Sequence, residues 1–378
     1  MILALSILQH SFLNTVRQLF LFLLFPLALA MQCKKTDKTS SSTSSTEADL
    51  DVTVLASGFN HPWEILWGPD NFIWMTEREG KISRVNPSNG AVIPILDIAE
   101  VAAQGEGGLL GMVLHPTFNT TPHVYVVYNY NSGSGYSEKV VRYTYDGTTL
   151  LNPVTILTGI NASTIHNGSR LLIIDNKLYI STGDAANANS AQNKSSLNGK
   201  LLRLNLDGTI PVDNPVPGNP YWTYGHRNAQ GMVYANKRIY VSEHGPASDD
   251  EINIIEKGKN YGWPDVMGLC ESNSERDFCS SNTNPIQAWT PTIAPCGMDY
   301  YNNNAIAQWK NSLLLTTLKD ARLYQLKLDA SFSKITSVNE YFTNEYGRLR
   351  DICISPAGVV YISTSNGRND KIIAIKAR

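Results

Sequence analysis

Polar segments rich in histidine, arginine and acidic residues are the part of this sequence that could do chemistry. They read HNGSRL at His166, YGHRNAQG from Tyr224, EHGPASDDEIN from Glu243 and GRLRD from Gly347. A histidine suits general-base catalysis because its ordinary pKa lies near neutral pH. The two arginines of GRLRD stand two positions apart, so on a regular strand both point to one face, where they could hold carboxylates. Each segment also has a structural interpretation: a core or turn histidine, a solvated strand face, or a turn with a helix cap.

The elements that must position these segments are β-strands. From residue 51 onward, short alternating strands bounded by Gly, Asn, Pro and Asp recur without a sustained helical apolar period. A turn, a strand rich in Tyr, Ile and Val, and a polar tail return six times, beginning at Pro69, Pro122, Asp175, Ala235, Lys310 and Pro356. This spacing predicts an all-β fold, a six-bladed β-propeller of four-stranded antiparallel blades. A two-sheet sandwich is the alternative, but it does not require six similar units.

A propeller brings the ends of its innermost strands together around a central channel. If the repeated strands are the innermost ones, the polar residues that end them should surround one pocket. These ends read Thr76-Glu77-Arg78, Gly183-Asp184, Glu243-His244-Gly245-Pro246, Lys319-Asp320 and Ser365-Asn366-Gly367.

Composition excludes several classes of protein. With 42% apolar and 17% charged residues among 378, the chain should form a packed globular body. Its 31 Lys and Arg against 33 Asp and Glu offer no basic face for nucleic acid. Five cysteines are too few for a disulfide framework, and no C-x-x-C-H haem motif occurs. Cys270 and Cys279 are candidates for one bridge, whereas Cys353 lies in an apolar alternation typical of a buried residue.

The N-terminal region predicts export. The apolar run Leu19–Met31 is too short to span a bilayer and matches a signal peptide over residues 1–33. Cys33, directly after the run, is a candidate for lipid attachment; plain signal cleavage and a buried helix are the alternatives. Residues 34–52 have the Ser- and Thr-rich composition of a flexible linker, and the propeller should occupy 53–378. We therefore expect a periplasmic protein or an outer-membrane lipoprotein, which touches the membrane only through its lipid.

Taken in order, the polar segments resemble the glucose/sorbosone dehydrogenase family, the soluble sugar dehydrogenases that use pyrroloquinoline quinone (PQQ) and calcium. Further matching segments are HPWEILWGPD at His61, TEREGKI at Thr76, GEGGLLGMVLHP at Gly105, LNGKLLRLNLDGTIPVDNP at Leu197, NYGWP at Asn260 and LKDARLYQLKLD at Leu318. The resemblance covers about residues 54 to 378. It implies a six-bladed propeller and the oxidation of aldose sugars at the anomeric carbon to lactones, with hydride transfer to the quinone.

The resemblance also implies roles for individual residues. His166 corresponds to the general base, Asp184 to the aspartate that orients it, and Asp250 to a residue near the reacting groups. Arg227 corresponds to the arginine that stabilises negative charge on the quinone oxygen. The residues expected to contact the cofactor are His166, Arg227, Asn228, Gln230, Lys319, Arg348 and Arg350, the last three as a cationic cradle for its carboxylates.

Calcium and substrate contacts follow from the same resemblance. The carbonyls of Gly245 and Pro246 correspond to ligands of the calcium beside PQQ, because calcium prefers hard oxygen ligands. Glu251 and the backbone of Tyr261 correspond to ligands of an additional calcium in some members.

On the substrate side, Glu106 stands where glucose-specific members carry glutamine, and Trp289 is a candidate pocket wall. The loop over residues 185–196 is short compared with that of glucose-specific members. We therefore expect a wide pocket and broad aldose specificity.

Two other functions remain as alternatives. A calcium-dependent propeller lactonase or other hydrolase would need carboxylate and asparagine ligands from several blades. A non-catalytic propeller that binds a polysaccharide or protein at the cell surface would need neither the histidine base nor the cationic cradle. On the main interpretation the partners are an aldose and an external electron acceptor, either a cytochrome or a quinone.

Overall fold

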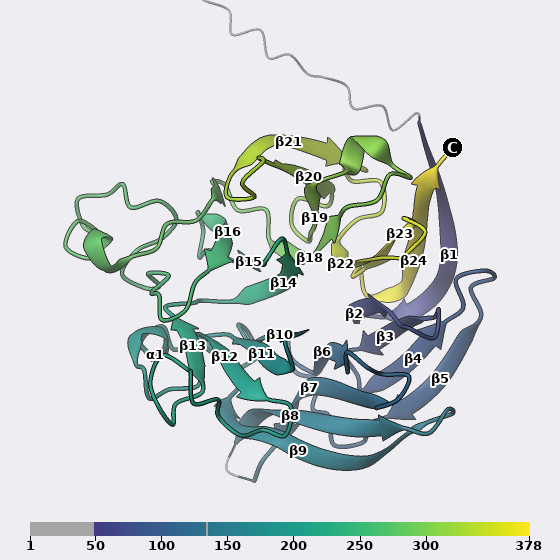
Figure 1. The fold of residues 1–378 in the computed structure, drawn as a ribbon, viewed down its shortest axis with the longest axis horizontal. Helices are drawn as coiled ribbons and strands as arrows, with labels where there is room; N and C mark the ends of the chain where they lie inside the picture. Colours follow the sequence, from purple (N-terminus) through teal and green to yellow (C-terminus); the bar gives the residue numbers. More distant parts are fainter. Residues whose placement is uncertain (1–48, 134) are drawn as a thin grey trace, which may run out of the picture. The chain divides into compact units, whose positions relative to one another are not determined.

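Six blades arranged around a central channel make up the part of the chain that the computed structural model describes, residues 49–133 and 135–378 (Figure 1). In these residues 24 strands form six four-stranded antiparallel sheets, with one short α-helix, α1 (Asn189–Gln192), and the 3₁₀ turns η2 (Cys279–Ser281) and η3 (Ala307–Trp309). The predicted six-bladed β-propeller is confirmed.

The blades follow one another along the chain, each written here from its innermost strand outwards. Blade 1 contains β2 (Pro62–Trp67), β3 (Ile73–Glu77), β4 (Lys81–Val85) and β5 (Val92–Asp97). Blade 2 contains β6 (Leu109–Leu114), β7 (His123–Asn131), β8 (Tyr136–Tyr145) and β9 (Leu150–Asn161). Blade 3 contains β10 (Gly168–Ile174), β11 (Lys177–Thr182), β12 (Lys200–Asn205) and β13 (Tyr221–Tyr224). Blade 4 contains β14 (Ala229–Ala235), β15 (Arg238–Glu243), β16 (Asp250–Ile255) and β17 (Gln287–Trp289). Blade 5 contains β18 (Pro295–Tyr301), β19 (Ser312–Thr317), β20 (Leu323–Leu328) and β21 (Ile335–Tyr341). Blade 6 contains β22 (Leu349–Ile354), β23 (Val360–Thr364), β24 (Arg368–Ala377) and β1 (Leu50–Asn60).

Apolar side chains fill the space between neighbouring blades. Between blades 1 and 2, Trp74 packs edge-on against Phe118 and Tyr145, with ring centroids 5.6 and 5.1 Å apart. Because each blade packs against two neighbours, a strand such as β3 (IWMTE) is buried on both faces. The innermost strands contact one another around the ring, from β2 and β6 round to β22 and β2.

The end of each second strand pairs with the start of the innermost strand of its own blade. Glu77 pairs with Pro62, for example, and Glu243 with Ala229. Residues that follow the second strands therefore lie at the same end of the ring as residues that precede the innermost strands. All six innermost strands also carry a register shift near this end, and such bulges re-aim the side chains beside them.

The six repeats found in the sequence are the second strands of the blades, and the expectation that they are the innermost ones is wrong. The innermost strands are harder to see in the sequence because bulges and close-packed glycines interrupt their alternation. A Cβ on Gly231, for instance, would collide with the carbonyl oxygen of Cys296 in the next blade. The second strands have regular alternation, and their polar ends still reach the channel because of the pairing just described.

The N-terminal strand completes the last blade. β1 pairs antiparallel with β24, from Leu50 opposite Ala377 to Asn60 opposite Arg368. Leu50 is buried, so the propeller begins there, within the stretch assigned to the linker and ahead of the predicted residue 53. The predicted signal peptide, Cys33 and the linker up to residue 48 lie outside the described residues. Within the described part of the chain, none of the helices has the length and apolar character needed to cross a membrane.

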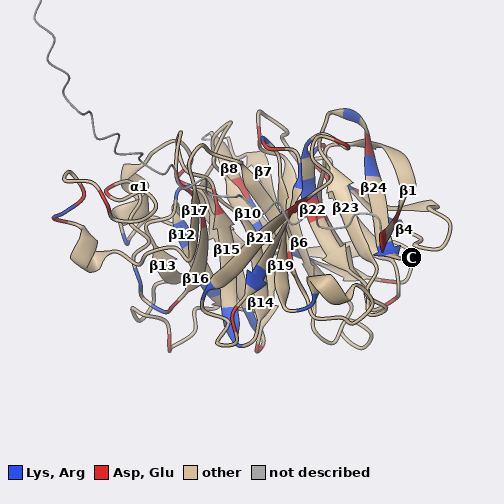
Figure 2. Cartoon of the chain, turned by 90° about the horizontal axis from the view of Figure 1, so that it is seen from above, with Lys and Arg blue, Asp and Glu red and all other residues tan. Residues whose placement is uncertain are grey.

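Cysteine and charge placement complete the description. Cys270 and Cys279 form a disulfide in the long loop between β16 and β17, and Cys353 is buried; both agree with the sequence-based expectation. In the side view, Lys and Arg segments are interspersed with Asp and Glu segments around the ring (Figure 2).

Candidate active site

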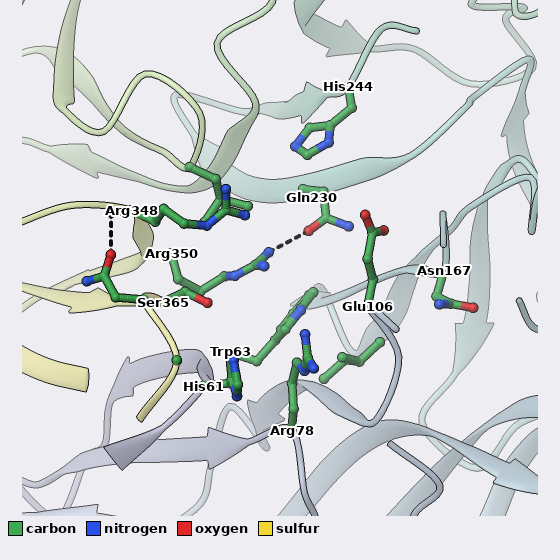
Figure 3. Close-up of a pocket in the computed structure, with 14 residues that line it drawn as sticks. His61, Trp63, Arg78, Glu106, Asn167, Gln230, His244, Arg348, Arg350 and Ser365 are labelled. Atoms are coloured by element: carbon green, nitrogen blue, oxygen red, sulfur yellow. Dashed lines mark hydrogen bonds between the residues drawn. The ribbon is translucent and has the colours of Figure 1, made fainter. Parts of the chain in front are cut away.

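A polar cavity of about 270 Å³ lies at the end of the ring where the strand ends meet (Figure 3). Every blade contributes to its lining, and its charged residues are Arg78, Arg348, Arg350 and Glu106. Three guanidinium groups thus face one carboxylate. A cavity with this charge balance is suited to an anionic ligand.

Arg350 is the most deeply placed of the three arginines, with 7% of its surface exposed. Its Nη1 donates a hydrogen bond to Gln230 Oε1 at 2.8 Å, while its Nε has no partner among the described residues. A buried guanidinium nitrogen without an acceptor is costly, and the positive charge of Arg350 beside the cavity favours an anionic ligand there. Arg348, two positions earlier, lines the same cavity although it precedes β22 and the strand has a register shift between Leu349 and Asp351.

Arg78 reaches the cavity from blade 1, where it follows β3. Its Nε also has no partner among the described residues. Burial, and then the charge of Arg350, lower the pKa of Arg78. An anion bound in the cavity would offset both effects, because an opposite charge nearby favours the charged form of an arginine.

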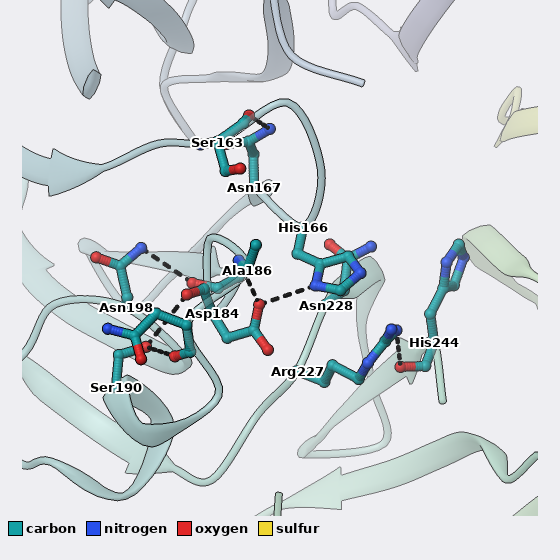
Figure 4. Close-up of polar contacts among 12 residues, drawn as sticks. Ser163, His166, Asn167, Asp184, Ala186, Ser190, Asn198, Arg227, Asn228 and His244 are labelled. Carbon is teal, nitrogen blue, oxygen red and sulfur yellow. Dashed lines mark hydrogen bonds and ion pairs between the residues drawn. The ribbon is translucent and has the colours of Figure 1, made fainter. Parts of the chain in front are cut away.

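His166 and Asp184 form a hydrogen-bonded pair beside this cavity (Figure 4). The distance from His166 Nδ1 to Asp184 Oδ1 is 2.8 Å, and Asp184 is 2% exposed. Asp184 Oδ2 accepts a further hydrogen bond from the indole nitrogen of Trp263 at 2.9 Å. With Nδ1 donating to a carboxylate, His166 Nε2 is left as the nitrogen that can accept a proton from a substrate.

The backbone around this pair explains two short motifs of the sequence. His166 has a φ of 58° and so lies in the left-handed region, and Ala185 N donates to its carbonyl oxygen at 3.0 Å. Gly183, just before Asp184, packs directly against that carbonyl, and a Cβ at this position would collide with it. The HNG and TGD segments therefore form a single structural unit.

Asn228 and Gln230 connect the histidine segment to the cationic cavity. Asn228 Oδ1 accepts hydrogen bonds from Gly168 N at 3.1 Å and from Gln230 Nε2 at 3.0 Å. Gln230 in turn accepts from Arg350. Both amides are buried, at 1% and 6% exposure, so they fix the geometry between the base and the cradle.

Glu106 contacts the backbone of His166. It lines the cavity, and its Oε2 accepts a hydrogen bond from the backbone nitrogen of His166 at 3.1 Å. This position allows the carboxylate both to hold the histidine backbone and to meet a polar group of a ligand.

Arg227 lies beside the carbonyls expected to bind calcium. Its Nη1 donates to the carbonyl oxygens of His244 at 3.2 Å and Gly245 at 2.9 Å, and its Nε has no partner among the described residues. A small cavity of about 20 Å³ at this point is lined by Gly245, Pro246 and Glu251, among others. These oxygen atoms suit calcium. A cation bound to the Gly245 carbonyl would compete with the Arg227 guanidinium for this oxygen.

Glu251 and Tyr261 line the same small cavity as Gly245 and Pro246. Burial, and then the neighbouring carboxylate of Glu243, raise the pKa of Glu251. In the described residues no group of three or more His, Cys, Asp or Glu side chains is arranged to hold a metal ion. A calcium ion in this cavity would therefore also need backbone or cofactor oxygens.

Asp250 is placed to hold backbone segments. Its Oδ1 accepts from Gly245 N at 2.8 Å, and its Oδ2 accepts from Ile293 N at 2.6 Å and Ala294 N at 2.7 Å. Burial raises the pKa of Asp250, and these hydrogen bonds oppose the shift. The carboxylate is thus occupied in shaping the loop that carries Gly245.

His244 is a neutral residue of the cavity. Its Nε2 donates to the carbonyl oxygen of Pro295 at 2.8 Å, which leaves Nδ1 as an acceptor. Burial, and then the positive charge of Arg350, lower the pKa of His244 to about 3. The positive charge of the cavity therefore comes from its arginines.

Of the expected site residues, Glu106, Gln230, Arg348 and Arg350 line the main cavity, and Arg227, Gly245, Pro246, Glu251 and Tyr261 line the small one. His166, Asp184, Asn228 and Asp250 line neither cavity, but hydrogen bonds join them to residues that do. Lys319 and Trp289 also line neither cavity. Lys319 is exposed, and its Nζ donates to Thr292 Oγ1 at 2.6 Å. Trp289 packs against the core of blades 4 and 5, with its ring centroid 5.9 Å from that of Tyr324.

Several site residues were not assigned a role from the sequence. Arg78 and His244 stand at repeated strand ends, which was the available signal for them. His61 and Trp63, both in the HPWEILWGPD segment, line the cavity from the start of β2. Trp263, in NYGWP, contacts Asp184. The signal for these three was only that they belong to quoted segments.

Comparisons with known proteins identify relatives of this chain. The sequence profile of the family described as Glucose / Sorbosone dehydrogenase matches residues 59–374. Quinoprotein glucose dehydrogenase B of Acinetobacter calcoaceticus is 33% identical in an alignment of 414 positions that covers 85% of this chain and 86% of that protein. Aldose sugar dehydrogenase YliI of Escherichia coli (strain K12) is 30% identical, covering 85% and 92%. The PQQ-bound form of aldose sugar dehydrogenase from Streptomyces coelicolor superposes with a TM-score of 0.76 at 31% identity, covering 88% of this chain and 99% of that one.

Proposed function

The chain belongs to the glucose/sorbosone dehydrogenase family, and from that membership we propose that it is a PQQ- and calcium-dependent dehydrogenase that oxidises aldose sugars at the anomeric carbon to lactones. One observation carries the proposal. The hydrogen-bonded pair His166–Asp184 stands next to a cavity that is lined by the three arginines Arg78, Arg348 and Arg350. A base beside a binding site for a multiply charged anion is what a quinone-dependent sugar oxidation requires.

The cofactor fits the residues present. PQQ carries carboxylates, and Arg78, Arg348 and Arg350 would hold them in the main cavity, with Gln230 keeping Arg350 in place. When bound, the quinone supplies the acceptor for the hydride that leaves the anomeric carbon. Arg227 lines the small cavity, which shares His244 with the main one, and would supply positive charge to the quinone.

The proton of the anomeric hydroxyl goes to His166. Nε2 accepts it, because Nδ1 is held by Asp184. The imidazolium that forms is stabilised by the Asp184 carboxylate, which is buried and already oriented by Trp263. Loss of the proton and of the hydride leaves a carbonyl at the anomeric carbon, which is the lactone.

Calcium would use oxygen atoms at the edge of this site. The carbonyls of Gly245 and Pro246 are its proposed ligands beside the cofactor, and Glu251 with the Tyr261 backbone those of an additional ion. A calcium ion on the Gly245 carbonyl would compete with Arg227 for that oxygen, and a displaced guanidinium would be available to the quinone. Asp250 keeps this loop in position through Gly245 N.

Substrate and partners follow from the same proposal. Glu106 would contact a sugar hydroxyl, because it lines the cavity next to the His166 backbone. Trp289 packs into the core and contributes less to the pocket than expected from the sequence. Electrons would leave to a separate acceptor, a cytochrome or a quinone. Export, with lipid attachment at Cys33, remains part of the proposal.

The deciding experiment is dye-linked aldose oxidation by apo-protein, with PQQ and calcium added separately and together. We expect activity only when both are present, and none in His166→Ala with both present. If PQQ binds without sugar oxidation, the proposed substrate class is wrong. If PQQ does not bind at all, the lactonase and the binding propeller become the leading functions.

A further inference from the structure

Trp263 joins the proton-accepting half of the site to its cationic half. The residue lies in the loop after β16 and is half-buried. It contacts Asp184 through its indole nitrogen and Arg227 through the face of its ring. From these contacts we propose that Trp263 is a positioning residue of the dehydrogenase, which holds Asp184 for His166 and Arg227 for the cofactor at the same time. The inference rests on the proposed function.

The first contact determines how Asp184 presents its two oxygens. Oδ2 accepts from Trp263 Nε1 at 2.9 Å, whereas Oδ1 accepts from Ala186 N at 2.8 Å and meets His166 Nδ1 at 2.8 Å. A carboxylate held at both oxygens cannot rotate away from the histidine. The Trp263 N–H therefore orients the residue that orients the base.

The second contact supports Arg227. Its guanidinium carbon lies 5.2 Å from the centroid of the Trp263 ring, within the range of a cation–π interaction. Its Nη1 is held by the carbonyls of His244 and Gly245. The ring thus supplies a flat surface against which the arginine can stay extended if the Gly245 carbonyl turns to calcium.

Trp263 is itself fixed against the loop that carries Asp184. Gln192 Nε2 donates to the Trp263 carbonyl at 2.7 Å, and Gln192 exchanges two side-chain hydrogen bonds with Asn260, both at 3.0 Å. Trp263 N donates to Gly225 O at 3.0 Å. The tryptophan therefore connects the loop after β16 to the loop that carries Asp184.

Two substitutions separate the two contacts. Trp263→Phe removes the N–H but keeps a ring, so kcat should fall by roughly tenfold or more while PQQ affinity stays near that of the wild type. Trp263→Leu removes the ring as well and should also weaken PQQ binding, measured by titrating apo-protein with the quinone.

Trp222→Phe is the matched control. Trp222 also carries a guanidinium over its ring, that of Arg203 at 4.7 Å, but it stands on β13 at the outer edge of blade 3. It should leave both kcat and PQQ affinity unchanged. An equal loss in Trp222→Phe and Trp263→Phe would mean that losing any such tryptophan harms the propeller, and would overturn the proposal.

A double-mutant cycle tests whether Trp263 acts through Asp184. Trp263→Phe should reduce kcat far less in an Asp184→Asn background than in the wild type, because its partner is already altered. The same factor in both backgrounds would contradict the proposal. His166→Ala and the wild type are measured alongside, so that an inactive wild type identifies failure of the proposed function instead.

A measurement on apo-protein gives an answer even if a Trp263 variant folds poorly. The chain has seven tryptophans, and the indole N–H signal of Trp263 can be assigned in an NMR spectrum of ¹⁵N-labelled protein by its loss in Trp263→Phe, or by assigning the other six. Asp184→Asn should shift this signal strongly and leave that of Trp222 in place. An unmoved Trp263 signal would show that the hydrogen bond is absent in solution.

Discussion

Arg350 and Gln230 are hydrogen-bonded to each other, Nη1 to Oε1 at 2.8 Å, although they stand on β22 and β14 of different blades. The bond holds the guanidinium in the cavity before any ligand arrives. Gln230 also donates to Asn228, which holds the backbone next to His166. The cationic cradle and the base are therefore parts of one network, and substitutions can show how far their tasks are separable.

The general base should be needed for turnover and dispensable for cofactor binding. His166→Ala is expected to lower kcat by about 10² to 10⁴, the usual contribution of a general base. PQQ affinity should change little, because the arginines of the cavity remain. Stopped-flow reduction of the bound quinone and an equilibrium titration measure the two effects, and equal losses in both would indicate a structural histidine.

The cavity arginines should determine cofactor affinity. Arg350→Ala and Arg78→Ala are each expected to weaken PQQ binding by about 1.5 to 3 kcal/mol, the range for a hydrogen bond to a charged group. Lys319→Ala is the comparison, since Lys319 is exposed and bound to Thr292. If Lys319→Ala costs more affinity than Arg78→Ala, the cradle inferred from the family resemblance holds and the cavity assignment of Arg78 is wrong.

Glu106 should affect sugar binding more than it affects the cofactor. Glu106→Ala removes both the cavity carboxylate and the acceptor for His166 N, so we expect a higher KM for aldoses together with a lower kcat. Glu106→Gln keeps an acceptor oxygen and should restore most of kcat while KM stays altered. Steady-state kinetics with several aldoses measures this, and identical kinetics for the two variants would exclude the backbone-holding role.

A buried carboxyl group predicts how stability depends on pH. Burial raises the pKa of Glu138 to about 8 from an ordinary value of 4.5, while hydrogen bonds from Ser169 and Asn129 oppose the shift. Between these values the folded protein binds a proton that the unfolded chain has lost, so this residue makes stability fall as the pH rises from 4.5 to 8.

Glu138→Gln should remove that dependence. The variant and the wild type are expected to have similar free energies of unfolding near pH 4.5. Above that pH, the free energy of unfolding of the variant should exceed that of the wild type by up to about 1.4 kcal/mol for each pH unit. Urea denaturation at a series of pH values measures the difference. Parallel curves for the two proteins would show that Glu138 is ionised in the folded state.

The fold was predictable because the second strands of the blades repeat clearly, as in β11 (KLYIST) and β23 (VYIST). Their role as second strands was not, since bulges near Gly168 and Leu349 hide the alternation of the innermost strands. Polar strand ends indicated where the site lies. They could not show that Lys319 bonds to Thr292 instead of facing the cavity, because that depends on a side-chain direction set by tertiary packing.

The site residues divide along the same line. His166 and Asp184 were assigned through the family resemblance of the segments that contain them, and the backbone there needs particular residues such as Gly183. The contact of Trp263 with Asp184 joins residues that are 79 positions apart, and no local sequence pattern predicts it. Arg78 was visible as the end of a repeated strand and as part of the TEREGKI segment, but an arginine there is equally compatible with an exposed turn.

The pairing of β1 with β24 also affects how the protein can be made. The two strands stand at opposite ends of the described chain, so β1 is synthesised first and has no partner until residues 368–377 exist. Until then both β1 and the outer edge of β23 are unpaired strands, which are the usual sites of association between chains. A polypeptide that ends before Arg368 would therefore lack β24 and leave β1 and the outer edge of β23 unpaired. It should aggregate instead of folding into a smaller propeller.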